Sequence, residues 1–423
     1  GDIRADGSLN VATGSLSTTL ESREFDFRKI SSLLPERAAA FLADWTWTKP
    51  PRIDASVQLR LPTSESPHTV LDSLAVDAHL ILNNSSYRGI ETTFASAELS
   101  YSNRVWRLPK FEWISPDGHL NGSIVADNTT RQFESRIEGA LDPVAFRPLL
   151  PSEQQKWIDQ ATFEAPPELS LNIAGYWDDI EALSVFGYIS TEAFNVRGVD
   201  FSGISMRVNY TNAIARFENV DLRHYERKAE ADRITLTRDR IYFHNVTSTL
   251  DPMLIAEVIG DEVVEVLSPY QFASPPHILL NGSLGLKTIE DADMHFQIAG
   301  DKFQWGLFHA DAASGGALWI DETLTLTNLN ALAYGGGNLN GNAFIDFTPP
   351  GGKAAYRLEG ACTNVDVQAL VLSLNATNQI EGKLSGTIRI DSADTTGLHT
   401  WNGQGHAELT DGLIWEIPIF GIF

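Results

Sequence analysis

Apolar and polar residues alternate with a period of two along much of the chain. The clearest segment is 53–61, IDASVQLRL, and segments 169–173, 278–284 and 384–390 repeat the pattern. Successive side chains of a strand point to opposite faces of a sheet. These segments therefore predict β-strands with one apolar and one polar face.

Shorter segments follow a different spacing, with apolar residues three and four positions apart, which predicts amphipathic helices. In the third of them, Ile255, Val258 and Ile259 fall on one helical face. Each segment follows an aspartate, and we expect these side chains to cap helix N-termini rather than to take part in catalysis. The four aspartates are Asp26, Asp142, Asp251 and Asp366.

The aspartates recur at intervals of 116, 109 and 115 residues, and proline pairs recur with them. The pairs lie at 50–51, 166–167 and 275–276, and each precedes an alternating segment. Features that recur in one register predict a repeat, here of about 110 residues. The expected boundaries are 1–24 for the end of a preceding repeat, 25–140, 141–249 and 250–364 for three repeats, and 365–423 for the start of a fourth.

Each repeat is expected to hold one or two short helices followed by roughly six strands, stacked edge to edge with its neighbours. A Gly-x-Leu-x-Gly element recurs at 118–122, 337–341 and 382–386, and its glycines suit hairpin turns and bulges. The expected fold is therefore mostly β with short α-helices. It is an elongated, curled antiparallel β-sheet, an open β-groove, built from these repeats.

Composition restricts the partners and the chemistry. The chain has 31 Lys and Arg against 55 Asp and Glu, a net charge of −24, and no basic block, which argues against nucleic acid as a partner. The single cysteine, Cys362, excludes an internal disulfide. The ten histidines form no metal-binding pair, and the glycine run 335–341 does not match a phosphate-binding loop. We therefore expect no metal, no cofactor and no catalytic residues, and so no enzyme.

The chain also contains no stretch of about 18 uninterrupted apolar residues, so the sequence predicts no transmembrane helix. Its last residues, 413–423, read LIWEIPIFGIF. An apolar pattern that stops in this way is unusual at a natural end, and we expect the chain to be a fragment of a longer parent.

Four strings near the C-terminus carry a family resemblance. They are AYGGGNLNGNAFIDF at 333–347, YRLEGACTNVDVQALV at 356–371, EGKLSGTIRID at 381–391 and GQGHAELTDGLIWEIPIFGIF at 403–423. In this order they resemble the C-terminal region of the AsmA-like family. The resemblance covers about 90 residues, and the upstream repeats share only the looser pattern of aspartates and proline pairs.

The resemblance implies a bacterial envelope protein of the periplasm, similar to the bridge-like lipid transfer proteins. It implies a non-enzymatic role in phospholipid transport or holding, which supports the outer membrane. The implied partners are phospholipid acyl chains, and the inner and outer membranes through parts of the parent outside this chain. The chain lacks the family's N-terminal membrane helix, so anchoring in the inner membrane is implied only for the parent.

The alternating segments give the candidate lipid-binding positions, because their apolar side chains would share one face of the sheet. These candidates are Ile53, Val57, Leu59, Leu169, Leu171, Ile173, Ile278, Leu280, Leu384, Ile388 and Ile390.

Two other functions fit the same sequence. In a structural or scaffolding envelope protein that assists outer-membrane assembly, the repeat helices would cover the apolar face completely. In a carbohydrate-binding β-protein, some of the ten tryptophans and ten tyrosines would form exposed platforms for sugars. An open apolar face would favour lipid binding, and a covered one would favour the scaffolding function. An exposed row of aromatic side chains beside carboxylates would favour carbohydrate binding.

Overall fold

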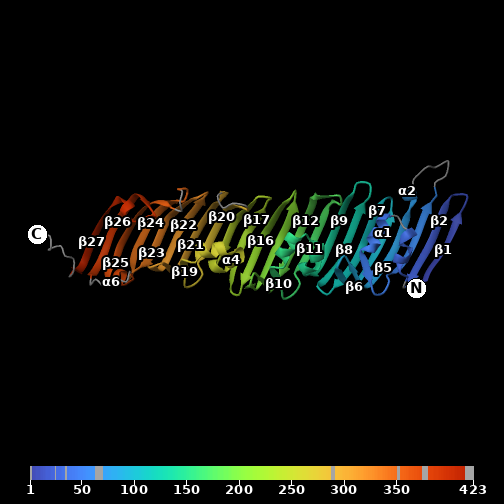
Figure 1. Cartoon of the computed structure of the whole chain (residues 1–423), viewed down its shortest axis with the longest axis horizontal. Helices are drawn as coiled ribbons and strands as arrows, with labels where there is room; N and C mark the ends of the chain where they lie inside the picture. The colour runs from blue at the N-terminus through green and yellow to red at the C-terminus, as the bar shows by residue number, and fades with distance from the viewer. Residues whose placement is uncertain are drawn as a thin grey trace. The chain divides into compact units, whose positions relative to one another are not determined.

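The computed structural model describes residues 2–23, 25–33, 36–61, 70–286, 291–349, 353–373 and 380–414. The C-terminal part of the family resemblance, 415–423, lies outside these residues. Contacts divide the chain into unit 1, with residues 1–196 and 200–217, and unit 2, with residues 197–199 and 218–423. Each unit is built mainly from one antiparallel β-sheet with short helices (Figure 1).

The sheet of unit 1 follows the order of the chain, and each strand pairs antiparallel with the next. Its strands are β1 (Asp2–Asn10), β2 (Ser15–Arg23), β4 (Arg52–Arg60), β5 (Ala75–Tyr87), β6 (Ile90–Ser102), β7 (Val105–Ser115), β8 (Gly118–Asp127), β9 (Gln132–Leu141), β11 (Glu168–Tyr176), β12 (Asp179–Thr191) and β15 (Gly203–Thr211). The short strand β3 (Trp45–Trp47) pairs with β5, and β10 (Ala161–Phe163) pairs with β13 (Phe194–Val196).

The sheet of unit 2 is built in the same way. Its strands are β17 (Arg227–Leu236), β18 (Arg240–Ser248), β20 (His277–Gly285), β21 (Asp293–Trp305), β22 (Phe308–Ile320), β23 (Thr323–Ala333), β24 (Gly337–Asp346), β25 (Ala355–Asp366), β26 (Ile380–Asp394) and β27 (Asn402–Ile414). The short strand β19 (Tyr270–Phe272) pairs with β21. Strands β14 (Val199–Phe201) and β16 (Ile214–His224) contribute residues to both units.

The expected class, mostly β with short helices and an open antiparallel sheet, is confirmed. The expected curl is wrong, because within each unit the sheet is open and uncurled. Strands pair with near neighbours in the sequence, and no pairing among the described strands joins the first strand of a unit's sheet to its last. Nothing within a unit therefore closes its sheet.

The aspartates lie at the helix N-termini, as the sequence predicts. Asp142 accepts the N–H of Val144 at 2.9 Å, Asp251 accepts that of Met253 at 2.9 Å, and Asp366 accepts that of Ala369 at 3.1 Å. The side chain of Asp26 accepts the N–H of Arg28 at 3.1 Å. The helices that begin here are η1 (Phe27–Leu33) with α1 (Glu36–Ala43), η2 (Pro143–Leu149) with α3 (Ser152–Ile158), α4 (Pro252–Ile259) with α5 (Asp261–Leu267), and α6 (Val367–Ser373).

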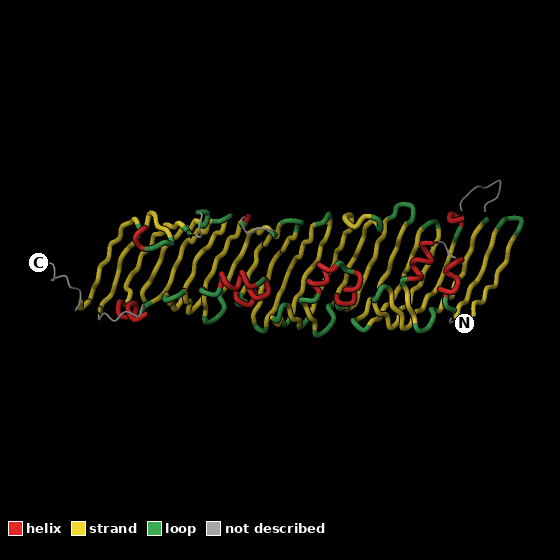
Figure 2. Tube along the Cα trace, in the orientation of Figure 1, coloured by secondary structure: helices red, strands yellow, loops and turns green. Residues whose placement is uncertain are grey.

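Six long strands follow each of the first three helical segments, which agrees with the expected content of a repeat. They are β4 to β9, then β11, β12 and β15 to β18, then β20 to β25. Figure 2 shows these helices lying towards one end of the strands in each unit. The small helices α2 (Val70–Ser73) and η4 (Leu398–Thr400) pack against β4 and β26.

Little of the chain is fully buried. The accessible surface is 26408 Å², against roughly 16,000 Å² expected for a compact globular protein of 46.5 kDa. Most apolar strand residues are half-buried, and the fully buried ones are scattered, such as Leu82, Leu250 and Val365. A large part of each sheet is therefore a single layer. Among the described residues, no helix is long and apolar enough to cross a lipid bilayer.

Candidate functional site

In unit 1, the strand register places all six predicted groove residues on one face of the sheet. Residues paired across antiparallel strands share a face. From Ile53 the pairing runs through Leu80, Ala97, Phe111, Gly122 and Ile137 to Leu171, and continues to Gly187 and Val208. Val57 and Leu59 share the face of Ile53, and Leu169 and Ile173 share that of Leu171, because alternate residues of a strand lie on one side.

In unit 2, a second line of paired residues connects the other candidates. It runs through Ala231, Val246, Leu280, Phe296, Ala317, Leu326, Ala343, Leu358, Ile390 and Gly403. Every residue in this line is apolar or glycine. Ile278 shares the face of Leu280, and Leu384 and Ile388 share the face of Ile390. We call this side of each sheet its apolar face.

The opposite side of each sheet carries charges and amides, and we call it the polar face. On β21, Met294, Phe296 and Ile298 are half-buried on the apolar face, whereas the residues between and before them are exposed. Ion pairs between residues two apart in one strand lie on the polar face, as in Arg136–Glu138 on β9 and Arg389–Asp391 on β26.

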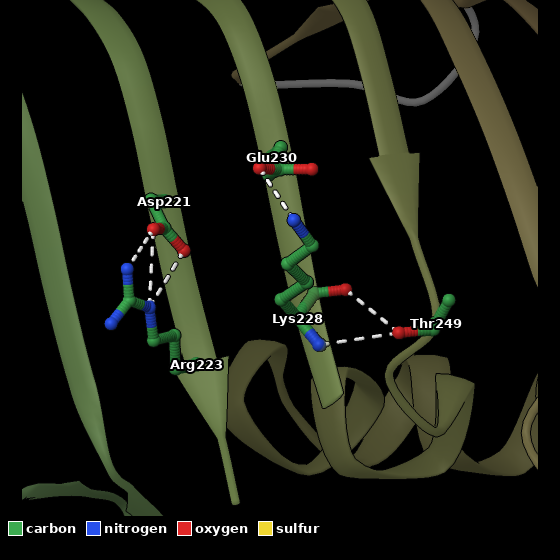
Figure 3. Close-up of polar contacts among 5 residues, drawn as sticks. All are labelled: Asp221, Arg223, Lys228, Glu230 and Thr249. Atoms are coloured by element: carbon green, nitrogen blue, oxygen red, sulfur yellow. Dashed lines mark hydrogen bonds and ion pairs between the residues drawn. The ribbon is translucent and has the colours of Figure 1, made fainter. Parts of the chain in front are cut away.

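Figure 3 shows two further pairs of this kind in unit 2, Arg223 with Asp221 and Lys228 with Glu230. The hydrogen bond from Arg223 lowers the pKa of Asp221, so this carboxylate stays charged well into the acidic range. The Lys228 ammonium lies 2.8 Å from the carboxylate of Glu230, and its backbone is bonded to the hydroxyl of Thr249 on the neighbouring segment. The side chains of these ion pairs stay partly exposed, so the polar face is in contact with water here.

The helices leave most of the apolar face uncovered. Nine of the eleven candidates are half-buried, and Ile388 keeps 43% of its surface exposed. Only Ile390 is fully buried, at 3%, on the strand against which η4 and α6 pack. Side chains that are shielded only by their neighbours on the same face have this intermediate exposure, whereas a second layer would bury them.

Sequence reasoning missed most of the residues that complete the apolar face. Phe296 follows the same alternation as the predicted residues and could have been found from it. Leu108 and Phe111 share the face although they are three apart, because β7 bulges between them. The same applies to Leu326 and Leu329 on β23. A period-of-two search does not detect such pairs.

Three bulges of unit 2, on β18, β23 and β25, share one arrangement. Asn245, Asn328 and Asn364 each have a positive φ, between 49° and 59°. The N–H of Asn245 donates to Oδ1 of Asn281 at 2.7 Å, and that of Asn328 donates to Oδ1 of Asn342 at 2.8 Å. In the third bulge, Ser385 accepts the N–H at 3.0 Å. We call this arrangement the clamped bulge. It keeps the apolar residues before and after the extra residue on one face.

Among the described residues, no group of three or more His, Cys, Asp or Glu side chains is placed to hold a metal ion. Comparison with protein-family models, curated proteins and solved structures found no match to this chain. The candidate site is therefore defined by its geometry. In each unit it is the uncovered apolar face of the sheet, which suits an apolar ligand.

Proposed function

We propose that this protein holds or moves phospholipids by accepting their acyl chains on the apolar face of its sheets, without covalent chemistry. One observation carries the proposal. In each unit, a continuous line of apolar and glycine residues crosses the paired strands, and most of its side chains are only half-buried. Such a surface is unfavourable in water and is stabilised by contact with hydrocarbon.

The dimensions suit an acyl chain. The line from Ile53 to Val208 crosses nine strands, which at about 4.8 Å per spacing is about 38 Å. One leaflet of a bilayer contributes about 15 Å of hydrocarbon, so a single acyl chain lying across the strands is shorter than the line. Each CH₂ group that leaves water contributes about 0.8 kcal/mol. The burial of several CH₂ groups of one acyl chain would therefore give measurable binding.

The family resemblance of the C-terminal strings supports the setting of this proposal. A member of the AsmA-like family would work in the bacterial periplasm, with its parent anchored in the inner membrane. The lipids would then pass between inner and outer membranes, in support of outer-membrane lipid homeostasis. This role requires an apolar surface and no catalytic group, which is consistent with the faces described above.

The test compares substitutions on the two faces of one strand. Leu171→Asp places a carboxylate on the apolar face of β11, and Asn172→Asp places one on the polar face beside it. The matching pair on β26 is Ile388→Asp and Thr387→Asp. Each protein is purified from bacteria, checked by circular dichroism, and extracted with organic solvent. Co-purifying phospholipid is then measured by mass spectrometry.

We expect the apolar-face variants to stay folded and to lose most of their bound phospholipid, at least fivefold relative to the matched controls. An unpaired carboxylate is costly beside hydrocarbon and harmless where the surface is wet. Folded apolar-face variants that retain all their lipid would overturn the proposal for this face. Unfolded variants would indicate a covered core, and wild-type protein without any lipid would favour the scaffolding function.

A further inference from the structure

The polar face of unit 2 contains a hollow that the lipid proposal does not use. It has a volume of about 660 Å³ and extends over β23 to β27, which lie side by side in Figure 1. Its floor includes the backbone of Gly341, Gly360 and Gly405. We call it the polar hollow. Its volume falls within the range of small-molecule sites.

Its lining side chains form two lines across the strands. In the first line, Asn330 pairs with Asn340, and Thr387 pairs with His406. Ala361 lies between Asn340 and Thr387, and its small side chain leaves the middle of the line open. In the described part of the chain, the side chains of Asn340, Thr387 and His406 make no hydrogen bond to another residue. They face the hollow with free donors and acceptors.

The second line runs from Asn342 through Glu359 and Arg389 to Gln404. Its charged members are held in place by neighbours. The amide of Asn342 donates to Glu359 at 3.1 Å, and Nε of Arg389 donates to Asp391 at 2.8 Å. Gln404, at the end of the line, has no such bond among the described residues. The hollow thus combines fixed charges with free amide groups.

We propose that the polar hollow binds a neutral, polyhydroxylated ligand, an oligosaccharide chain lying across the strands. Hydroxyl groups both donate and accept, and the free amides, the hydroxyl and the imidazole offer both functions on adjacent strands. Strands are about 4.8 Å apart, so successive lining residues recur at a spacing similar to one sugar unit. This site lies on the face opposite to the proposed acyl-chain surface and is independent of it.

Charge argues for a neutral ligand. Inside the hollow, the carboxylate of Glu359 and the guanidinium of Arg389 offset each other, and Asp391 engages Arg389 further. An anion would find no unpaired cation here, and the net charge of −24 would repel it. The lining has no Phe, Tyr or Trp ring, so hydrogen bonds would supply the affinity. We expect a dissociation constant on the order of 1 mM.

The test uses saturation-transfer difference NMR on the full chain with maltohexaose, cellohexaose and chitohexaose at millimolar concentration. We expect at least one of the three to receive saturation from the wild-type protein. The double variant Asn340→Ala/Gln404→Ala removes two free amides and should weaken that binding about tenfold. Circular dichroism confirms that the variants are folded.

The matched control is Asn338→Ala/Thr363→Ala, a cross-strand pair on the same polar face that does not line the hollow. Its binding should equal that of the wild type. No saturation transfer to any of the three oligosaccharides would overturn the proposal. Equal binding by the two double variants would overturn it as well, and so would displacement of the oligosaccharide by inorganic phosphate.

Discussion

Single side chains complete the hydrogen bonding of the backbone where helices begin and where strands bulge. The carboxylate of Asp366 accepts a hydrogen bond from the N–H of Ala369 in the first turn of α6. It also accepts one from Nζ of Lys383 at 3.0 Å. The side chain of Asn281 accepts a hydrogen bond from the backbone N–H of Asn245. The side-chain amide of Asn245 donates in turn to Asp232 at 2.7 Å. Left unpaired, each of these backbone donors would cost about as much as a lost hydrogen bond.

The contribution of Asp366 should depend on pH. The N–H of Ala369 and then the Lys383 ammonium hold the pKa of this carboxyl below its ordinary value. A lowered pKa means that the stabilisation is complete above the unfolded-state value and disappears as pH falls through the lower folded-state value. Asp366→Ala should destabilise α6 by about 1 kcal/mol at pH 7, measured by hydrogen exchange at Ala369.

The control for this prediction is Asp366→Asn, which keeps an acceptor for the helix but loses the ion pair. It should cost less than Asp366→Ala at pH 7, and its difference from the wild type should vanish at a pH below the folded-state pKa. If the stability difference between Asp366→Asn and the wild type did not change with pH, the charged carboxylate of Asp366 would not be the source of the stabilisation.

The contribution of the first clamped bulge to stability can be measured by denaturation. Asn281→Ala removes the acceptor for Asn245 and should cost about 1 kcal/mol, seen as a lower urea midpoint. Asn281→Ser should recover part of this loss, since Ser385 fills the equivalent position at the third clamped bulge. Equal stability of the wild type and Asn281→Ala would show that the clamp is not needed.

At the scale of elements, glycines on the apolar face differ in how much room the neighbouring strand leaves for a side chain. A Cβ added to Gly187 on β12 would lie 2.0 Å from the carbonyl oxygen of Ser170 on β11, so the two strands would have to move apart. At Gly360 on β25, the nearest atom to an added Cβ is 3.3 Å away. The two glycines occupy similar places in the sheets but tolerate side chains differently.

We therefore expect Gly187→Ala to destabilise the protein by about 1–3 kcal/mol, because it overpacks a tight contact. Gly360→Ala should change stability less, since the carbonyl oxygen of Asn340 has to give way by only a few tenths of an ångström and alanine fits a strand better than glycine. Thermal unfolding of both variants followed by circular dichroism measures the difference. The reverse order would mean that the strands move apart easily.

At the scale of the molecule, each unit presents a large apolar surface with few fully buried residues beneath it. If acyl chains bind this surface as proposed, they would supply part of the stability, because ligand that binds only the folded state shifts unfolding by mass action. Bound acyl chains would then cover apolar side chains that the helices leave exposed.

Delipidated protein should accordingly be stabilised by lysophosphatidylcholine. At a free concentration of 100 times the dissociation constant, the gain is about 2.7 kcal/mol, visible as a higher melting temperature. Glycerophosphocholine, which has the same headgroup but no acyl chain, should leave the melting temperature unchanged. Equal shifts with both compounds would place the binding at the headgroup and contradict the role of the apolar face.

The sequence predicted the elements better than it predicted how they combine. Strand alternation located Ile53 and Leu171 on one face, and the aspartates located the helices, because both signals are local. The clamped bulges were not predicted, since an asparagine at positive φ resembles any loop asparagine in a sequence. The polar hollow was missed because it gathers residues such as Asn340 and His406 from separate strands, each unremarkable in its own segment.

The clamped bulge also bears on how these sheets can change over evolutionary time. Inserting one residue into a strand ordinarily turns every later side chain to the opposite face. In β18, the left-handed Asn245 absorbs the extra residue, so Phe243 and Val246 stay on the same side. With a clamped bulge, a strand could gain or lose a single residue while its later side chains keep their place on the apolar face. An insertion that would reverse the faces of an ordinary strand would, at such a position, leave the apolar face intact.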